Sequence, residues 1–318
     1  MTPETLKPTK PISRLRRECI NRAFAITCAS VAILAAGVLL VLIVSIAIDG
    51  ARYLSWTFLT ENAHYLPDQS GFFNAVVGSL WICIVCALTA LPIGIGAAIY
   101  LNEFAPRSRF TRFIQLNISN LAGVPSVVYG LIGLAVFVSF FNIFNSSSPV
   151  YATPTSPNSI FYLGLPFGRS VLAGGLTLAL VVLPVVIIAT QEALRAVPNS
   201  LREGSLALGS TRWQTVRRMI LPAALPGIMT GSILSLSRAI GETAPILVVG
   251  ASLYYTAIPA NLLDSYSAMP VQIYAWAGDT NPEFHKLAAS GIVVLLAVLL
   301  TFNAAAIFIR AKFQRPLS

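Results

Sequence analysis

Charged residues are scarce in this chain. Only 10% of its 318 residues are Asp, Glu, Lys or Arg, whereas an ordinary soluble domain carries about 25%. Hydrophobic residues make up 56% and the mean hydropathy is +0.75. So few charges cannot cover a surface that faces water, which argues against a soluble enzyme or a disordered protein. Four cysteines without regular spacing also argue against a disulfide scaffold.

Motifs of catalysis and cofactor binding are missing as well. None of the four lysines follows a glycine, so the chain has no nucleotide-binding G-x-x-x-x-G-K-[ST] loop. The two histidines, His64 and His285, form no zinc-binding pattern. Cys83 and Cys86 are interpreted as small apolar residues within a hydrophobic segment. We therefore expect no enzymatic activity, no metal and no cofactor in this chain.

The chain contains several long stretches without charged residues. About 20 apolar residues suffice for a helix to cross roughly 30 Å of hydrocarbon. The pattern predicts an all-α polytopic membrane protein with six transmembrane helices. They are expected near residues 23–48, 74–101, 117–141, 170–190, 223–248 and 288–309. Residues 142–159, rich in Ser, Asn and Pro, are expected to form an external loop.

The distribution of positive charge predicts the orientation of these spans. Seventeen of the 21 lysines and arginines fall in the two ends of the chain and in the loops after spans two and four. Such residues accumulate on the cytoplasmic side. We expect a multi-pass protein of the inner cell membrane with a cytoplasmic N-terminal tail (1–22), a first span (23–48) and a cytoplasmic C-terminal tail (311–318). Anionic membrane lipids suffice as partners of these cations, and nucleic acid is not expected.

The inner loop between spans four and five, residues 191–222, has the pattern of a short helix. Asn199 or Ser200 is expected to cap its start, and Glu203 falls in its first turns, where the helix dipole favours a carboxylate. Gly209 is expected to end it. Small residues inside this helix would let another backbone approach closely, as in docking into a groove.

This loop resembles the E-A-A-x3-G-x9-I-x-L-P motif of permease subunits in binding-protein-dependent ABC importers. The matching positions are Glu203, Gly204, Ser205, Gly209, Met219, Leu221 and Pro222. The spacing agrees throughout, while Gly and Ser replace two alanines and Met replaces Ile. The resemblance implies that Glu203, Gly204, Ser205, Gly209, Leu221 and Pro222 belong to a coupling segment, whose helix inserts into an ATPase subunit.

Four further runs resemble the phosphate-specific branch of these permeases, the PstA type. They are G-F-F-N-A at 71–75, L-P-I-G-I-G at 91–96, N-L-A-G-V-P-S-V-V-Y-G at 120–130 and S-R-A-I-G-E-T-A-P at 237–245. The resemblance covers a permease domain over about 70–310 and implies the type I ABC importer fold. It also implies three kinds of partner: a second, homologous permease subunit, two subunits that bind ATP and Mg²⁺, and an extracytoplasmic phosphate-binding protein.

Two charges, Arg238 and Glu242, lie inside the fifth expected span. An isolated charge at a helix centre costs about 2.5–3.5 kcal/mol, so neither should face lipid. Four residues apart, they share a helix face. Either they pair and fix helix packing, or Arg238 faces the substrate path and binds the anion while Glu242 orients it or gates. A guanidinium suits phosphate oxygens.

Neighbouring residues could contribute to such a site. Gly241 and Pro245 could unwind the helix there and expose backbone groups to a cavity. Further donors could come from Asn120, Ser126, Ser237 and Thr243.

The sequence therefore predicts the permease subunit of an ATP-driven phosphate importer that works by alternating access. A permease for another oxyanion, such as molybdate or sulfate, remains open because Arg238 argues only for an anion. A secondary transporter is less favoured, since no paired broken spans are recognisable and the loop at 191–222 would be unexplained. A structural scaffold in a regulatory membrane complex is a weaker alternative.

Overall fold

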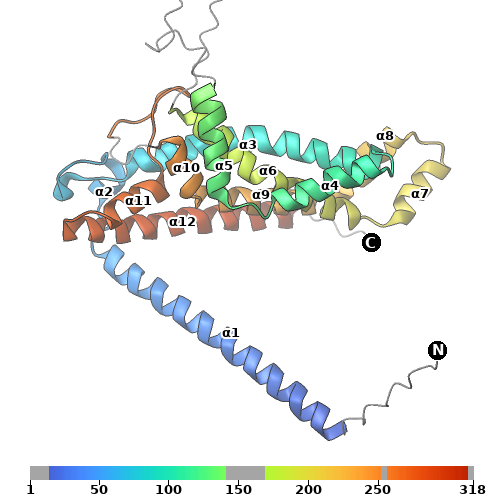
Figure 1. The fold of residues 1–318 in the computed structure, drawn as a ribbon, viewed down its shortest axis with the longest axis horizontal. Helices are drawn as coiled ribbons and strands as arrows, with labels where there is room; N and C mark the ends of the chain where they lie inside the picture. Colours follow the sequence, from blue (N-terminus) through green and yellow to red (C-terminus); the bar gives the residue numbers. More distant parts are fainter. Residues whose placement is uncertain (1–13, 141–168, 252–255, 314–318) are drawn as a thin grey trace, which may run out of the picture.

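A computed structural model describes residues 14–140, 169–251 and 256–313, and within these ranges the regular structure is entirely helical (Figure 1). Five helices are long and apolar enough to cross a membrane, and a strongly bent helix pair makes a sixth. The all-α prediction with six spans is confirmed in this form. The expected external loop at 142–159 lies outside the described residues, as do the ends of both tails.

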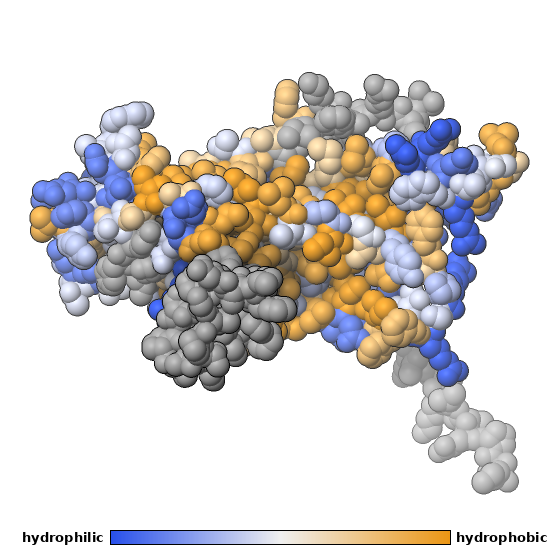
Figure 2. All heavy atoms as spheres, turned by 90° about the horizontal axis from the view of Figure 1, so that it is seen from above, coloured by the Kyte–Doolittle hydropathy of each residue, from blue (hydrophilic) through white to orange (hydrophobic). Residues whose placement is uncertain are grey.

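The spans are joined by short helices that gather at opposite ends of the bundle. The long helices are α1 (Arg14–Ala51), α3 (Phe73–Ile99), α6 (Val171–Arg195), α9 (Leu221–Ile240) and α12 (Pro282–Phe313). One end carries α2 (Trp56–Thr60), η1 (Pro67–Gln69) and α11 (Met269–Ala277). The other carries η2 (Tyr100–Phe104), α7 (Asn199–Ala207), α8 (Arg212–Thr215) and η5 (Val216–Ile220). Figure 2 shows hydrophobic residues across the middle of one face and hydrophilic residues toward both ends, as a membrane-spanning bundle requires.

The third span is broken. Helix α4 (Arg109–Leu121) and helix α5 (Ser126–Gly133), which continues through the π-helical turn η3 (Leu134–Phe140), are bent by 103°. Pro125 lies at the break with extended ψ of 136°, and its ring removes a backbone donor. The Tyr129 hydroxyl donates to the Leu121 carbonyl at 2.8 Å and ties the two arms together. The span expected at 117–141 is therefore present as two helices joined at a sharp bend, and not as one continuous helix.

The fifth span is also interrupted. Helix α9 ends at Ile240, Gly241 caps it, and α10 (Ala244–Val249) begins with Pro245 in its first turn. The expected unwinding near Gly241 and Pro245 is confirmed, whereas a continuous helix over 223–248 is not found. Spans three and five are therefore both broken.

Helices α3 and α6 form the centre of the bundle and approach each other through glycines. A Cβ on Gly94 would lie 2.8 Å from Val186 Cγ1, and one on Gly175 would lie 2.5 Å from Val85 Cβ. Small residues at helix contacts permit this close packing, which supplies dispersion contacts in a lipid environment. Pro184 stays within α6 without ending it. The α3–α6 pair is thus a closely packed unit around which the broken spans are arranged.

Helix α1 leaves the bundle at an oblique angle (Figure 1). It contacts α12 near its C-terminal end, where the Ser290 hydroxyl donates to the Gly50 carbonyl at 2.8 Å. From residue 17 to residue 49 every residue is exposed or half-buried. The expected first span at 23–48 lies within this helix, whose apolar surface is left for lipid or another subunit.

Candidate functional site

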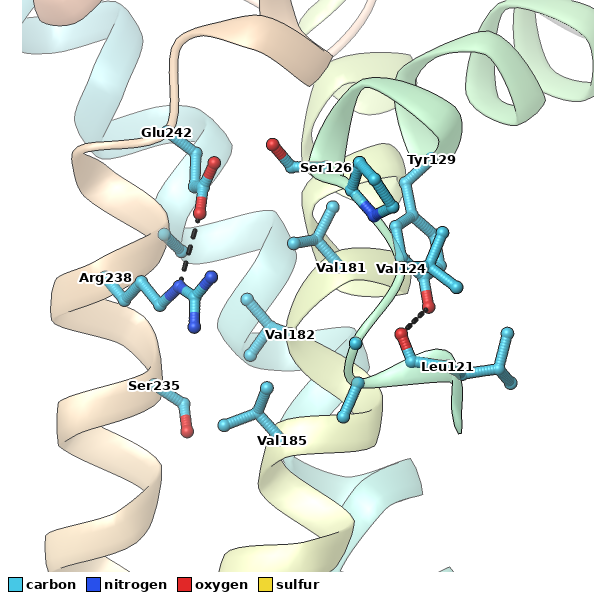
Figure 3. A pocket seen from close by; sticks show the side chains of 14 residues that line it. Leu121, Val124, Ser126, Tyr129, Val181, Val182, Val185, Ser235, Arg238 and Glu242 are labelled. Atoms are coloured by element: carbon cyan, nitrogen blue, oxygen red, sulfur yellow. Dashed lines mark hydrogen bonds and ion pairs between the residues drawn. The ribbon is translucent and has the colours of Figure 1, made fainter. Parts of the chain in front are cut away.

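The two broken spans meet at a pocket of about 250 Å³ (Figure 3). It is lined by Leu121, Ala122, Gly123, Val124, Pro125, Ser126, Tyr129, Val181, Val182, Val185, Ser235, Arg238, Ala239 and Glu242. The α4–α5 break forms one side, the C-terminal end of α9 another, and α6 the apolar wall between them. The runs at 120–130 and 237–245, more than a hundred residues apart in sequence, therefore contribute to one site.

A close helix contact holds the two breaks together. Gly130 of α5 faces Pro245 of α10, and a Cβ on this glycine would lie 2.8 Å from the proline Cα. Any side chain at position 130 would push α10 away from α5. Packing between α5 and α10 therefore fixes the relative position of the two breaks.

Arg238 and Glu242 are the charged groups of this pocket. Arg238 Nε lies 3.3 Å from Glu242 Oε1, so the two side chains form the ion pair that was one of the two alternatives (Figure 3). The arginine lies in the last turn of α9, where the helix dipole favours a cation. Its side chain is 67% exposed in the isolated chain, while that of Glu242 is 16% exposed. The guanidinium is therefore accessible to a further partner, while the carboxylate is largely held within the protein.

The remaining lining is mostly apolar, and only some of the expected donors reach it. Ser126 lines the pocket as proposed. Ser237 is instead buried against α12, where its hydroxyl donates to Asn303 Oδ1 at 2.8 Å. Asn120 and Thr243 are not among the lining residues. Ser235, which was not anticipated, lines the pocket, but its hydroxyl donates to the Gly231 carbonyl at 2.7 Å.

These groups define what the pocket can do chemically. It presents one guanidinium and the Ser126 hydroxyl opposite a wall of three valines, with a carboxylate already bound to the guanidinium. Apolar walls lower the local dielectric and strengthen the attraction of a cation for an anion. The arrangement suits transient binding of a small oxyanion that competes with Glu242 for Arg238.

The short helix expected in the loop at 191–222 is present as α7. Gly209 ends it with φ of +83°, in the left-handed region, and the Ser210 amide donates back to the Ser205 carbonyl at 3.3 Å. The expected cap is wrong, however. Pro198 occupies the N-cap position without a side-chain hydrogen bond, and Asn199 is already helical.

The residues that resemble the coupling motif are divided between two places. Glu203, Gly204 and Gly209 are exposed on or just after α7. The half-buried Ser205 shares a 3.0 Å hydrogen bond with the Thr215 hydroxyl. Leu221 and Pro222 open α9, directly after the π-helical turn η5. The motif thus joins an exposed helix surface to the base of the span that carries Arg238.

A pair missed in the sequence holds α7 in place. Arg202 Nη2 lies 3.1 Å from Glu103 Oε1 of η2, and the same guanidinium donates to the carbonyls of Leu194 at 2.6 Å and Val197 at 2.7 Å. From the sequence alone, Arg202 is only one of the cations that predict the cytoplasmic side. The sequence does show that Glu103 is the only acidic residue between Asp68 and Glu192, which singles out the acid but not its partner.

Comparisons with known proteins agree on the kind of molecule. A family model described as "Binding-protein-dependent transport system inner membrane component" matches residues 90–315. A probable ABC transporter permease, YqgI of Bacillus subtilis strain 168, is 30% identical over 89% of this chain and 92% of its own length. The phosphate transport system permease PstA 1 of Mycobacterium tuberculosis H37Rv is 36% identical over 77% of this chain and 72% of its own length.

A second phosphate permease and a solved structure are also similar to this chain. PstC 1 of Mycobacterium tuberculosis H37Rv is 34% identical over 78% of this chain and 75% of its own length. The crystal structure of a bacterial alginate ABC transporter contains a chain that matches with a TM-score of 0.61 and 17% identity. The match covers 94% of this chain and 99% of that one, and at this identity it establishes a common fold.

Proposed function

The chain belongs to the binding-protein-dependent transport system inner membrane component family, and we propose that it is the transmembrane permease subunit of an ATP-driven phosphate importer. The observation that carries the proposal is the pocket at the two broken spans. The two runs that resemble phosphate permeases both contribute to it. Arg238 supplies a guanidinium on a side chain that is 67% exposed and can therefore meet an anion.

The pocket would handle phosphate by exchange of partners at Arg238. An entering phosphate takes guanidinium N–H groups from Glu242, and the carboxylate reclaims them when the anion leaves. Binding is thereby kept weak enough for release, which a transport path requires. Interruptions at Pro125 and Gly241 let the adjoining helix segments change direction without unfolding a whole span, since irregular backbone is tolerated where it lines a cavity.

The energy for transport would come from ATP hydrolysis by other chains of the complex. This chain would pair with a second, homologous permease, and two ATPase subunits would bind ATP and Mg²⁺. An extracytoplasmic phosphate-binding protein would deliver the substrate. Support comes from two different relatives, PstA 1 and PstC 1, that are each named as a phosphate transport system permease protein. The exposed surface of α7, with Leu208 beside it 89% exposed, adds to this.

The test is uptake of labelled phosphate in cells that lack this chain and have no other active phosphate system. We expect the wild-type chain to restore uptake, and unlabelled phosphate, but not sulfate or molybdate, to compete. Arg238→Gln should lose uptake at an equal membrane level. Arg107→Gln is the matched control, because Arg107 is exposed and does not line this pocket.

Two results would contradict the proposal. Equal competition by sulfate or molybdate would transfer the assignment to another oxyanion. Undiminished uptake without the chain would remove it from phosphate transport. Full uptake by Arg238→Gln would leave the cargo assignment intact and reduce Arg238 to a packing role.

A further inference from the structure

The link between Arg202 and Glu103 connects three separate elements. Arg202 belongs to α7, Glu103 to the π-helical turn η2 that extends α3, and the carbonyls of Leu194 and Val197 lie at the C-terminal end of α6. Asn199 Oδ1 also accepts from this guanidinium at 3.1 Å. A single side chain therefore holds α7 against the ends of two spans.

The contact is half-buried and contains several hydrogen bonds. The side chains of Arg202 and Glu103 are 18% and 10% exposed, and Asn102 Nδ2 donates to the same carboxylate at 2.7 Å. The carbonyls at the end of a helix have no partner within it, and here the guanidinium fork supplies donors. Arginine suits this task better than lysine, because its planar donors point in several fixed directions.

The two spans held in this way lead to the pocket. Helix α6 packs closely on α3 through Gly94 and Gly175, and it carries Val181, Val182 and Val185 of the pocket wall. A displacement of α7 that is passed to the ends of α3 and α6 would thus reach the pocket through a continuous series of packed elements.

We propose that Arg202 is a positioning residue for transport, and that its link to Glu103 and to the end of α6 makes α7, α3 and α6 move as one body. The inference rests on the proposed function, in which α7 docks on an ATPase subunit. Without the guanidinium, α7 keeps its exposed docking surface, but its movement is no longer passed fully to the spans.

A nearby arginine offers a matched control. Arg195 also forms an ion pair, with Glu192 at 3.2 Å, but both side chains are exposed and lie on one helix. Such a pair has little effect on structure. Arg195→Gln therefore removes the same chemical group at the same end of the molecule without separating elements.

The first measurement is the amount of phosphate imported per ATP hydrolysed by the complete complex in liposomes. Arg202→Gln should lower this ratio about fivefold or more, the usual scale of coupling between sites, while Arg195→Gln leaves it unchanged. Adding Glu103→Gln to Arg202→Gln should cause little further loss, because both changes break the same link. The proposal would be overturned by an unchanged ratio in Arg202→Gln. It would also be overturned if the loss in the double variant equalled the product of the losses in Arg202→Gln and Glu103→Gln.

A second measurement does not depend on the cargo. Spin labels are placed at Leu208 and Tyr100, both exposed, in a complex whose permease lacks its native cysteines Cys19, Cys28, Cys83 and Cys86. With Arg202 present, the distance between labels should stay constant when an ATP analogue binds; with Arg202→Gln it should change or broaden. The same behaviour in both proteins would overturn the link even if phosphate proves to be the wrong cargo.

The outcome stays decisive if Arg202→Gln does not assemble with the ATPase subunits. Arg202→Lys then replaces it, because lysine keeps the charge but cannot reach Glu103 and both carbonyls together. A lowered ratio and a broadened label distance support the proposal, and wild-type values for both contradict it.

Discussion

At the scale of single residues, Arg238 and Glu242 are the one cation and the one anion among the described residues that line the pocket. The two side chains are unequal: the arginine is mostly exposed and the glutamate mostly buried. The carboxylate can therefore remain in place while the guanidinium turns to another anion. This asymmetry fits a binding group with a built-in competitor better than a structural ion pair.

Removing either charge should have different consequences for phosphate uptake. Arg238→Gln leaves Glu242 alone in a pocket that must receive an anion, and like charges about 6 Å apart repel by roughly 3 kcal/mol at an effective dielectric constant of 20, about a hundredfold in binding. Glu242→Gln leaves the cation free, so uptake should fall less. The double variant should regain part of the activity lost in Arg238→Gln. Uptake assays at equal expression decide this, and a double variant no better than Arg238→Gln would refute the repulsion.

Two glycines of the segment that resembles the coupling motif should respond oppositely to alanine. Gly209 has φ of +83°, whereas Gly204 lies inside α7, and a Cβ at either meets no atom within 4 Å. Gly209→Ala should destabilise the end of α7 by about 1–2 kcal/mol, while Gly204→Ala should stabilise the helix by about 0.5–1 kcal/mol. Hydrogen exchange of the amides of residues 199–210 should be faster in the first variant and slower in the second. The reverse order would contradict the backbone explanation.

Local chemistry made some of these residues predictable. The charges of Arg238 and Glu242 were conspicuous inside an apolar segment, and their spacing predicted the pair. The spacing of the loop motif predicted α7 and its end at Gly209. The link between Arg202 and Glu103 was missed because 99 positions separate them, and no local pattern indicates which arginine meets a distant acid.

At the scale of elements, the breaks in spans three and five are the main departure from the sequence analysis. Hydropathy reports how apolar a segment is but contains no information about its direction, so residues 109–138 pass as one span although they bend by 103°. Pro125 and Gly241 signalled local distortion. The size of the bend depends on tertiary contacts, such as Gly130 against Pro245, which no single segment reveals.

The α3–α6 contact gives a testable prediction about packing. Gly175→Ala places a methyl group 2.5 Å from Val85 Cβ, and overpacking of this kind costs about 1–3 kcal/mol. Gly96→Ala is the control, since Gly96 lies in the same pair of helices and its Cβ would meet no atom within 4 Å. Thermal unfolding of the purified protein in detergent should show a lower Tm for the first variant only. Equal Tm values would show that the helices can separate without loss.

At the scale of the whole molecule, helix α1 and the hydrophobic middle of the bundle expose apolar surface (Figure 2). This surface needs lipid or another subunit to cover it. The residues of α1 from 17 to 49 bury almost no surface against the rest of the chain. The other helices therefore pack together almost without α1, whose apolar surface is left to lipid or to another subunit. The charge distribution then decides which end of the bundle faces the cytoplasm.

The orientation can be tested directly. In a permease without its four native cysteines, a cysteine is introduced at Leu208, beside α7, or at Tyr65, at the opposite end; both positions are exposed. Because lysine and arginine accumulate at the end that carries α7, this end should lie inside. A membrane-impermeant thiol reagent should label Tyr65→Cys in intact cells and Leu208→Cys only after the membrane is opened. Labelling of Leu208→Cys in intact cells would place α7 outside, where no ATPase could reach it, and would contradict both the import function and the role proposed for Arg202.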